Sequence, residues 1–316
     1  MTIDTIHNGD CLPFLHGIPD DSIDCCITSP PYFALRDYGT QGQIGLEDSP
    51  EEYIAHLCVV FAQVLRVLKP EGTVWLNMGD TYNGYRGNAC RSNNETPYAH
   101  ARHQAARPPL HGLDSKSAKN KDLLGIPWML AFALRDMGFY LRQDIIWQKP
   151  NPVPESVIDR CTKSHEYIFL LTKSARYYFD ADSIREPAVS DNRAHRIHHR
   201  RIENGTYRTN YCDYTIPQTT TRNKRDVWTV PVRPSKGCHF ATFPEELIAP
   251  CVLAGCPEGG VILDPFIGTG TTAIVAHRYN RHFIGCEINP EYHAFASHRI
   301  REAMAQPSLF PVESFD

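Results

Sequence analysis

Short apolar runs bounded by polar or turn-forming residues recur along the chain. Runs of this kind are typical of strands that are buried on both faces of a sheet. We expect such buried strands at residues 22–28, 73–78 and 260–264, and further strands at 140–147 and 282–286. The pattern therefore predicts a sheet made largely of buried strands.

Helical patterns separate these runs. Ser49 is a predicted N-cap, Pro50 takes the first helical position, and apolar residues then recur at helical spacing up to Leu68. A second helix is expected over residues 123–137, where Gly138 ends it.

The last predicted element before the basic part of the chain is a hairpin. Residues 166–172 and 176–179 are its expected strands. Alternating strands and helices with one such hairpin favour an α/β fold. Its sheet is expected to be mostly parallel, with one antiparallel strand and helices on both faces.

A glycine-rich loop follows one of the predicted strands. Asp264 ends the strand, and the spacing Gly268-x-Gly270-x-x-Ala273 fits the fingerprint of dinucleotide sites, where glycines let the backbone approach a ligand. Glu287 ends the next strand, where a carboxylate can accept hydrogen bonds from ribose hydroxyls. No Gly-Lys-Ser/Thr follows, which argues against a P-loop. The loop therefore predicts a nucleotide-type cofactor site.

A second polar segment, Ser29-Pro30-Pro31-Tyr32, follows the predicted strand 22–28. Two prolines fix φ and remove two amide donors, so the segment presents carbonyl and hydroxyl acceptors beside an aromatic ring. Chemistry on an exocyclic amine needs acceptors for the amine hydrogens and a flat ring to stack on the base. The alternative explanation is a proline-stiffened turn with a packed tyrosine.

Together the two segments resemble those of the DNA amino-methyltransferases, which methylate N6 of adenine or N4 of cytosine with S-adenosylmethionine. That family has an (Asp/Asn/Ser)-Pro-Pro-(Tyr/Phe) motif and an Asp-Pro-Phe-x-Gly-x-Gly-Thr-type cofactor loop, matched here by residues 29–32 and 264–271. The catalytic motif comes first, which is the permuted order of the β group. The resemblance covers about residues 6–300 and implies a seven-stranded, Rossmann-like methyltransferase sheet with an inserted, loop-rich target-recognition region.

The resemblance also implies a set of cofactor-binding residues. It assigns Asp10 and Phe266 to the adenine of the cofactor, Asp264 to its methionine amino group, and residues 236–244 to the methionine portion. An Asx turn is the alternative explanation of Asp10. The implied set is Asp10, His239, Phe240, Thr242, Asp264, Phe266, Gly268, Gly270, Thr271 and Glu287.

For the target base, the resemblance implies that Ser29, Pro30, Pro31 and Tyr32 are catalytic. Residues 144–150 resemble the strand and loop that close over the flipped base, with Trp147 as a second stacking ring and Lys149 beside it. A core tryptophan is the alternative explanation of Trp147. Serine at position 29, where adenine-N6 enzymes commonly have aspartate, favours cytosine N4 over adenine N6.

The net charge of −4 is unevenly distributed. Residues 84–121 contain seven Lys or Arg against two acids, and residues 190–225 contain eight against three. Both stretches are poor in aliphatic residues, which predicts long surface loops, and a local basic surface suffices for phosphate contacts. A solvated loop is the simpler explanation of any single arginine. For the second stretch as a whole we expect DNA recognition, with Arg193, Arg196, Arg200, Arg201 and Arg208 as contacts.

These features divide the chain into a catalytic half (1–183, with a loop insertion at 84–121), a target-recognition insert (184–234) and a cofactor-binding half (235–316). Double-stranded DNA is the expected partner. A homodimer and a cognate restriction enzyme are further candidates.

The composition argues against a membrane-spanning, a secreted or a zinc-binding protein. No apolar stretch approaches the roughly 18 residues of a membrane helix, and no signal peptide is recognisable. Eleven cysteines without a Cys-x-x-Cys pair indicate reduced thiols in a cytoplasm. The histidines and cysteines match no common zinc spacing, so no metal is expected.

Three rival functions share part of this evidence. A nicotinamide-dependent oxidoreductase would share the glycine loop, but too few residues follow Glu287 for its remaining strands. An amino-methyltransferase acting on RNA or protein would share the Pro-Pro-aromatic segment. A DNA-binding module without catalytic activity would share the basic stretches.

Overall fold

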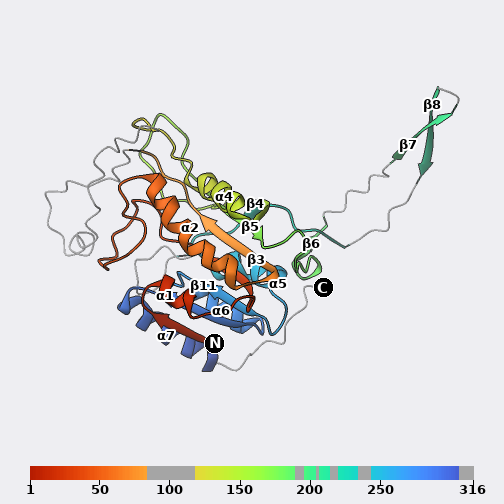
Figure 1. The fold of residues 1–316 in the computed structure, drawn as a ribbon. Coiled ribbons are helices and arrows are strands. Elements are labelled where there is room, and N and C mark those ends of the chain that lie inside the picture. Colours follow the sequence, from red (N-terminus) through yellow and green to blue (C-terminus); the bar gives the residue numbers. More distant parts are fainter. Residues whose placement is uncertain (84–117, 189–195, 204–205, 214–219, 234–242, 306–316) are drawn as a thin grey trace. The chain divides into compact units, whose positions relative to one another are not determined.

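The computed structural model describes residues 1–83, 118–188, 196–203, 206–213, 220–233 and 243–305 (Figure 1). For residues 196–203 and 206–213 it describes the backbone alone. The chain forms two compact units, Met1–Asp180 with Asp226–Asp316, and Ala181–Arg225.

An eight-stranded sheet is the centre of the first unit. Its strands lie in the order β1-β12-β11-β2-β3-β5-β4-β10. β5 is antiparallel to both of its neighbours, and all other neighbouring pairs are parallel. The strands are β1 (Thr5–Asn8), β2 (Ile23–Thr28), β3 (Leu68–Met78), β4 (Tyr140–Gln148), β5 (His165–Thr172), β10 (Val227–Thr229), β11 (Val261–Asp264) and β12 (His282–Glu287). The expected mostly parallel sheet is thus confirmed, with eight strands where the resemblance implied seven.

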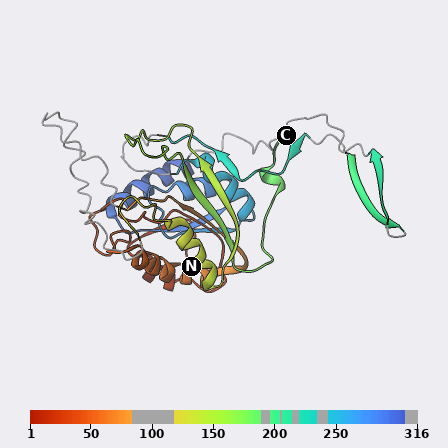
Figure 2. The same ribbon diagram turned by 90° about the horizontal axis from the view of Figure 1, so that it is seen from above.

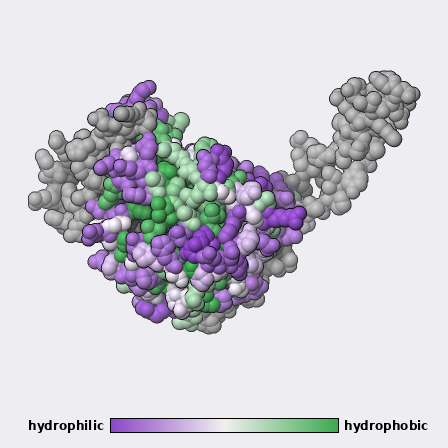
Figure 3. All heavy atoms as spheres, in the orientation of Figure 1, coloured by the Kyte–Doolittle hydropathy of each residue, from purple (hydrophilic) through white to green (hydrophobic). Residues whose placement is uncertain are grey.

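Helices cover both faces of this sheet (Figure 2). The helices α1 (Cys11–His16), α2 (Pro50–Val67) and α4 (Ile126–Met137) contact one another in one layer. The helices α5 (Glu245–Gly255), α6 (Thr271–Arg278) and α7 (Pro290–Ala305) form the other. In Figure 3 hydrophobic residues lie among hydrophilic ones on the face over α2 and α4.

Helix α2 follows the sequence pattern closely. The Ser49 hydroxyl accepts a hydrogen bond from the Glu52 amide at 3.2 Å, and Pro50 is the first helical residue. Several of its apolar side chains, among them Leu57, Phe61 and Val64, are fully buried in the main hydrophobic core. This burial fixes α2 against the strands that carry the site.

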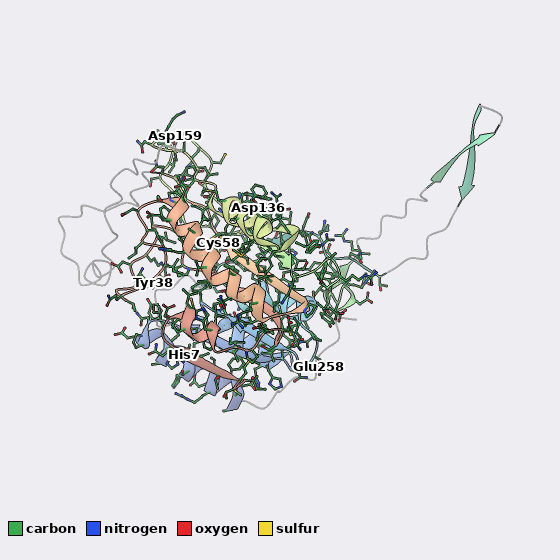
Figure 4. The ribbon with its side chains drawn as sticks, in the orientation of Figure 1. His7, Tyr38, Cys58, Asp136, Asp159 and Glu258 are labelled. Carbon is green, nitrogen blue, oxygen red and sulfur yellow. The ribbon has the colours of Figure 1, made fainter. Side chains whose placement is uncertain are left out.

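The permuted chain order brings the two diagnostic segments together. β11 pairs with β2 in parallel, with Leu263 opposite Cys26. The carboxyl ends of neighbouring parallel strands meet at one edge of a sheet, so the loops that follow Thr28 and Asp264 lie side by side. In Figure 4, Tyr38 lies toward this carboxyl edge, and Glu258, in the turn before β11, lies toward the other end.

The expected hairpin of 166–172 with 176–179 is wrong. β5 pairs with β3 and β4 instead, and residues 176–179 form no strand. The Tyr178 amide donates to the Glu71 carbonyl at 2.9 Å, which ties that segment to the sheet by isolated hydrogen bonds. A buried strand satisfies its backbone on both sides, and the sequence pattern does not specify its neighbours.

The second unit contains two short antiparallel ladders. β6 (Glu186–Pro187) pairs with β9 (Thr221–Arg222), and β7 (Arg196–Glu203) pairs with β8 (Thr206–Asp213). A 3-10 turn, Asp182–Ile184, precedes them. Glu186 forms ion pairs with Arg222 and Arg225. The expected insert, 184–234, extends past this unit, since Val227–Thr229 adds a strand to the main sheet.

Candidate active site

A cavity of about 210 Å³ lies at the carboxyl edge of the sheet. Both diagnostic segments line it, together with the ends of β1 and β12. The expected residues that line it are Asp10, Ser29, Pro30, Pro31, Tyr32, Trp147, Lys149, Phe266, Gly268, Thr271 and Glu287. Asp264 and Gly270 do not line it.

Several expected residues cannot be placed against the cavity. His239, Phe240, Thr242 and Arg193 lie outside the described residues. Arg196, Arg200, Arg201 and Arg208 lie on β7 and β8, where the backbone alone is described. Their roles stay predictions.

The two loop glycines have different functions in the fold. Gly268 lines the cavity with φ +53°, in the left-handed region that glycine adopts readily. Gly270 has φ +83° and is the N-cap of α6. A Cβ atom there would lie 3.1 Å from Cδ1 of Ile300. Gly270 therefore allows close packing of α7 against the loop.

The side chain of Asp264 holds the glycine-rich loop in place through hydrogen bonds. Its carboxylate accepts hydrogen bonds from the Thr28 hydroxyl at 2.7 Å, the Thr272 hydroxyl at 2.6 Å and the Phe266 amide at 3.1 Å. Burial raises the pKa of this carboxyl to about 6, against the effect of its three donors. The resemblance assigns Asp264 to a cofactor amino group, and that role stays a prediction; in the structure its side chain joins β2, the loop and α6.

Glu287, at the end of β12, and Asp10, just after β1, both line the cavity. Glu287 is 8% exposed, and its Oε1 accepts from the Asn289 amide at 2.8 Å. Burial raises the pKa of Glu287 to about 7. Asp10 is the N-cap of α1, and its Oδ1 accepts from the Leu12 amide at 2.9 Å. Asp10 thus makes the capping turn that was the alternative explanation, and it still lines the cavity.

The Pro-Pro segment is held from several sides. The Tyr53 hydroxyl donates to the Pro31 carbonyl at 2.7 Å. The Tyr32 hydroxyl donates to Glu166 Oε2 at 2.7 Å and lies 3.2 Å from Asn77 Oδ1. Burial, followed by the negative charge of Glu166, raises the pKa of Tyr32 well above its usual value. Tyr32 is therefore a neutral hydrogen-bond donor.

Sequence reasoning missed Glu166 and Asn77. Glu166 is at the start of β5, which is antiparallel, so it reaches the edge where β3 ends with Asn77 and Met78. Lys149, which follows β4, forms an ion pair with Glu166 Oε1. The sequence signal that could have identified Glu166 is its position as a charged residue at the start of an otherwise apolar run.

Trp147 has the environment of a core residue. Its side chain is 3% exposed, and its Nε1 donates to the Val230 carbonyl at 2.8 Å. The Lys149 ammonium lies 4.3 Å from the centre of its ring. These contacts agree with the core explanation, but Trp147 also lines the cavity, and its role as a second stacking ring stays a prediction.

The loop between Phe33 and Gly45 contributes further lining residues. They are Leu35, Arg36, Tyr38, Gly42, Gln43 and Ile44. The Tyr38 ring contacts the Tyr292 ring edge-on at 5.9 Å between centres, which joins this loop to α7. The described residues contain no group of three His, Cys, Asp or Glu side chains placed to hold a metal, and no helix among them is long and apolar enough to cross a membrane.

The chain is similar along most of its length to known type II methyltransferases. It is 44% identical over 292 residues to type II methyltransferase M.SmaI of Serratia marcescens, covering 92% of this chain and 89% of that protein. It is 43% identical over 298 residues to M.Cfr9I of Citrobacter freundii, covering 94% and 87%.

Solved structures show the same fold at lower identity. PvuII DNA methyltransferase (cytosine-N4-specific) matches with a TM-score of 0.63 and 17% identity, covering 98% of this chain and 89% of that one. A putative DNA modification methylase from Thermus thermophilus, complexed with S-adenosyl-L-methionine, matches with a TM-score of 0.60 and 23% identity, covering 96% and 95%.

The DNA methylase family model for N6 and N4 methyltransferases matches residues 23–298. A match of this extent, together with relatives above 40% identity over nearly the whole chain, establishes the family. The chain therefore belongs to the DNA methyltransferases that transfer a methyl group from S-adenosylmethionine to N6 of adenine or N4 of cytosine.

Proposed function

We propose that this enzyme methylates N4 of cytosine in duplex DNA. The observation that carries the proposal is the neutral Ser29 at the cavity, in the first position of the catalytic segment. The carboxylates among the described lining residues are Asp10, Glu166 and Glu287, and each accepts hydrogen bonds from this chain. We therefore assign the Ser29 hydroxyl as the side-chain acceptor for the target amine beside the Pro-Pro turn.

A neutral acceptor suits the reaction. Direct transfer from a bound sulfonium methyl donor to the amine nitrogen would need no covalent enzyme intermediate, and the donor would leave as a neutral thioether. When bound, S-adenosylmethionine supplies the electrophilic methyl group. Ser29 and the Pro30 carbonyl accept the two amine hydrogens, and the Tyr32 ring stacks on the base. The amine proton is lost after transfer, since a serine hydroxyl is no effective base.

The chemistry of the lining residues also fits the cofactor. We assign the Glu287 carboxylate to the ribose hydroxyls and the Phe266 ring to the adenine, and glycine at position 268 would let the backbone approach the cofactor closely. The base must leave the helical stack to reach this cavity, because its amine is inaccessible inside a duplex. The cytosine-N4 specificity named for the PvuII enzyme supports the same choice of base by analogy of fold.

Product analysis tests this proposal. DNA is incubated with the enzyme and labelled cofactor and digested to nucleosides, which mass spectrometry separates. We expect N4-methylcytosine, and Ser29→Ala should lower its rate of formation at least tenfold, because the amine loses one acceptor. Labelled N6-methyladenine as the sole product would refute the assignment of the base.

The type II names of its relatives support a restriction enzyme as cognate partner. Modification-sensitive sequencing of the treated DNA gives the recognition site. An endonuclease encoded beside this chain should then cleave that site only when it is unmethylated. A homodimer and DNA recognition by the Ala181–Arg225 unit remain proposals that sedimentation and deletion of β7–β8 would test.

A further inference from the structure

A buried polar cluster lies at the hydroxyl end of Tyr32. We call Tyr32, Asn77, Lys149 and Glu166 the Glu166 cluster. Its members come from the Pro-Pro segment, the end of β3, the residue after β4 and the start of β5. Glu166 is at its centre: Oε2 accepts from the Tyr32 hydroxyl and the Asn77 amide, and Oε1 pairs with the Lys149 ammonium.

The cluster is more than a surface ion pair. The side chains of Glu166 and Lys149 are 13% and 18% exposed. Buried ion pairs are weak contributors to stability, because desolvation offsets most of their attraction, and apolar replacements are often as stable. An ion pair kept here, against the wall of the catalytic cavity, indicates a function in the site.

Tyr32 has little freedom to move within this arrangement. A Cβ atom on Gly79 would lie 2.6 Å from its Cε2, so the ring packs directly against the backbone at that position. Asn77 is itself fixed, since its amide also donates to the Tyr167 carbonyl at 3.1 Å. The hydroxyl contacts with Glu166 therefore set both the depth and the tilt of the ring.

We propose that Glu166 is a positioning residue for methyl transfer, acting through the Tyr32 hydroxyl to hold the ring at the orientation in which it stacks on the target base. The inference rests on the stacking function proposed for Tyr32. Lys149 pairs with Glu166 Oε1 and holds the Glu166 side chain in place.

A double-mutant cycle in the full-length enzyme tests this. We expect Glu166→Gln and Tyr32→Phe each to lower kcat about ten- to hundredfold, the range of a lost charge-assisted hydrogen bond. KM for S-adenosylmethionine should change less than twofold, because the cluster acts through Tyr32, which is assigned to the target base and not to the cofactor. The double variant should be no slower than the slower single variant.

A matched control separates positioning from stability. Asp24 is a similarly buried carboxylate, 11% exposed, that pairs with Lys69 at 2.7 Å. It also accepts a hydrogen bond from the Val261 amide. These contacts lie where β2 and β11 begin, whereas the cavity lies where these strands end. Asp24→Asn should lower the unfolding midpoint as Glu166→Gln does and leave kcat unchanged. Equal losses of kcat in both variants overturn the proposal, as do multiplicative effects in the double variant.

The outcomes also distinguish this inference from the proposed function. If Tyr32→Ala is inactive while Tyr32→Phe matches the unmodified enzyme, the stacking function stands and the positioning by Glu166 is refuted. If Tyr32→Ala keeps full activity, the stacking function itself fails. Should Glu166→Gln not fold, Tyr32→Phe alone decides, since unchanged kcat in that variant overturns the proposal.

Discussion

Replacing Thr272 by valine removes one of the two hydroxyls that stabilise the buried Asp264 carboxylate. The two side chains have nearly the same shape, so packing changes little. The Thr272 hydroxyl donates to Asp264 Oδ2 at 2.6 Å, and the Thr28 hydroxyl and Phe266 amide donate to Oδ1. The substitution therefore leaves one carboxylate oxygen without the donor that the described structure gives it.

The magnitude follows from the pKa of Asp264. Burial raises that pKa from 3.8 to about 6, so the folded chain binds this proton more tightly than the unfolded chain does. The contribution of the group to stability is therefore greatest below about pH 4 and is lost as the pH rises to about 6, a difference of about 3 kcal/mol.

Loss of the Thr272 hydroxyl raises this pKa further. Below pH 5 the carboxyl is largely protonated, and the variant should lose about 1 kcal/mol, the value of a neutral hydrogen bond. At pH 8 the carboxylate is charged, and the loss should be about 1.5–3 kcal/mol. The destabilisation should thus increase with pH across the range in which Asp264 titrates.

Urea unfolding at several pH values between 5 and 8 measures this difference. Thr73→Val is the matched control, because the Thr73 hydroxyl is fully buried and donates to the Gly255 carbonyl at 2.9 Å, far from any buried carboxylate of the loop. Its destabilisation should be the same at every pH. A Thr272→Val effect that does not vary with pH would refute the assignment of a charged, donor-dependent Asp264.

Two further predictions concern the cofactor site. Burial raises the pKa of Glu287 to about 7, and an ionised carboxylate is the better ribose acceptor, so affinity for S-adenosylmethionine should fall up to about tenfold per pH unit below 7 and level off above it. Calorimetry from pH 6 to 8.5 measures this, and in Glu287→Gln that dependence should disappear. Gly270→Ala should cost more stability in thermal unfolding than Gly259→Ala. Both positions have positive φ, at about 1–3 kcal/mol of strain each, but only at Gly270 does the new Cβ meet Ile300, at 3.1 Å. Equal losses in the two variants would show that close packing at Gly270 has no effect.

The local elements were predictable where local chemistry decides them. The helix expected from Pro50 is α2, because its cap, its first-turn proline and its apolar spacing are all read from neighbouring residues. The buried strands were found within one or two residues, apart from the longer β3. The partner of β5 was not, because an apolar run has the same pattern whichever strands lie beside it.

The candidate site divides in the same way. The sequence by itself determined the two loops, their order and the family, since glycine spacing and the Pro-Pro turn are constraints on adjacent backbone. Only the tertiary structure decided what faces the cavity. It turned Asp264 toward Thr28 and Thr272, and it brought Glu166 to Tyr32, 134 positions away. Such contacts depend on strand order and register, which are set by burial across the whole sheet and not by any segment alone.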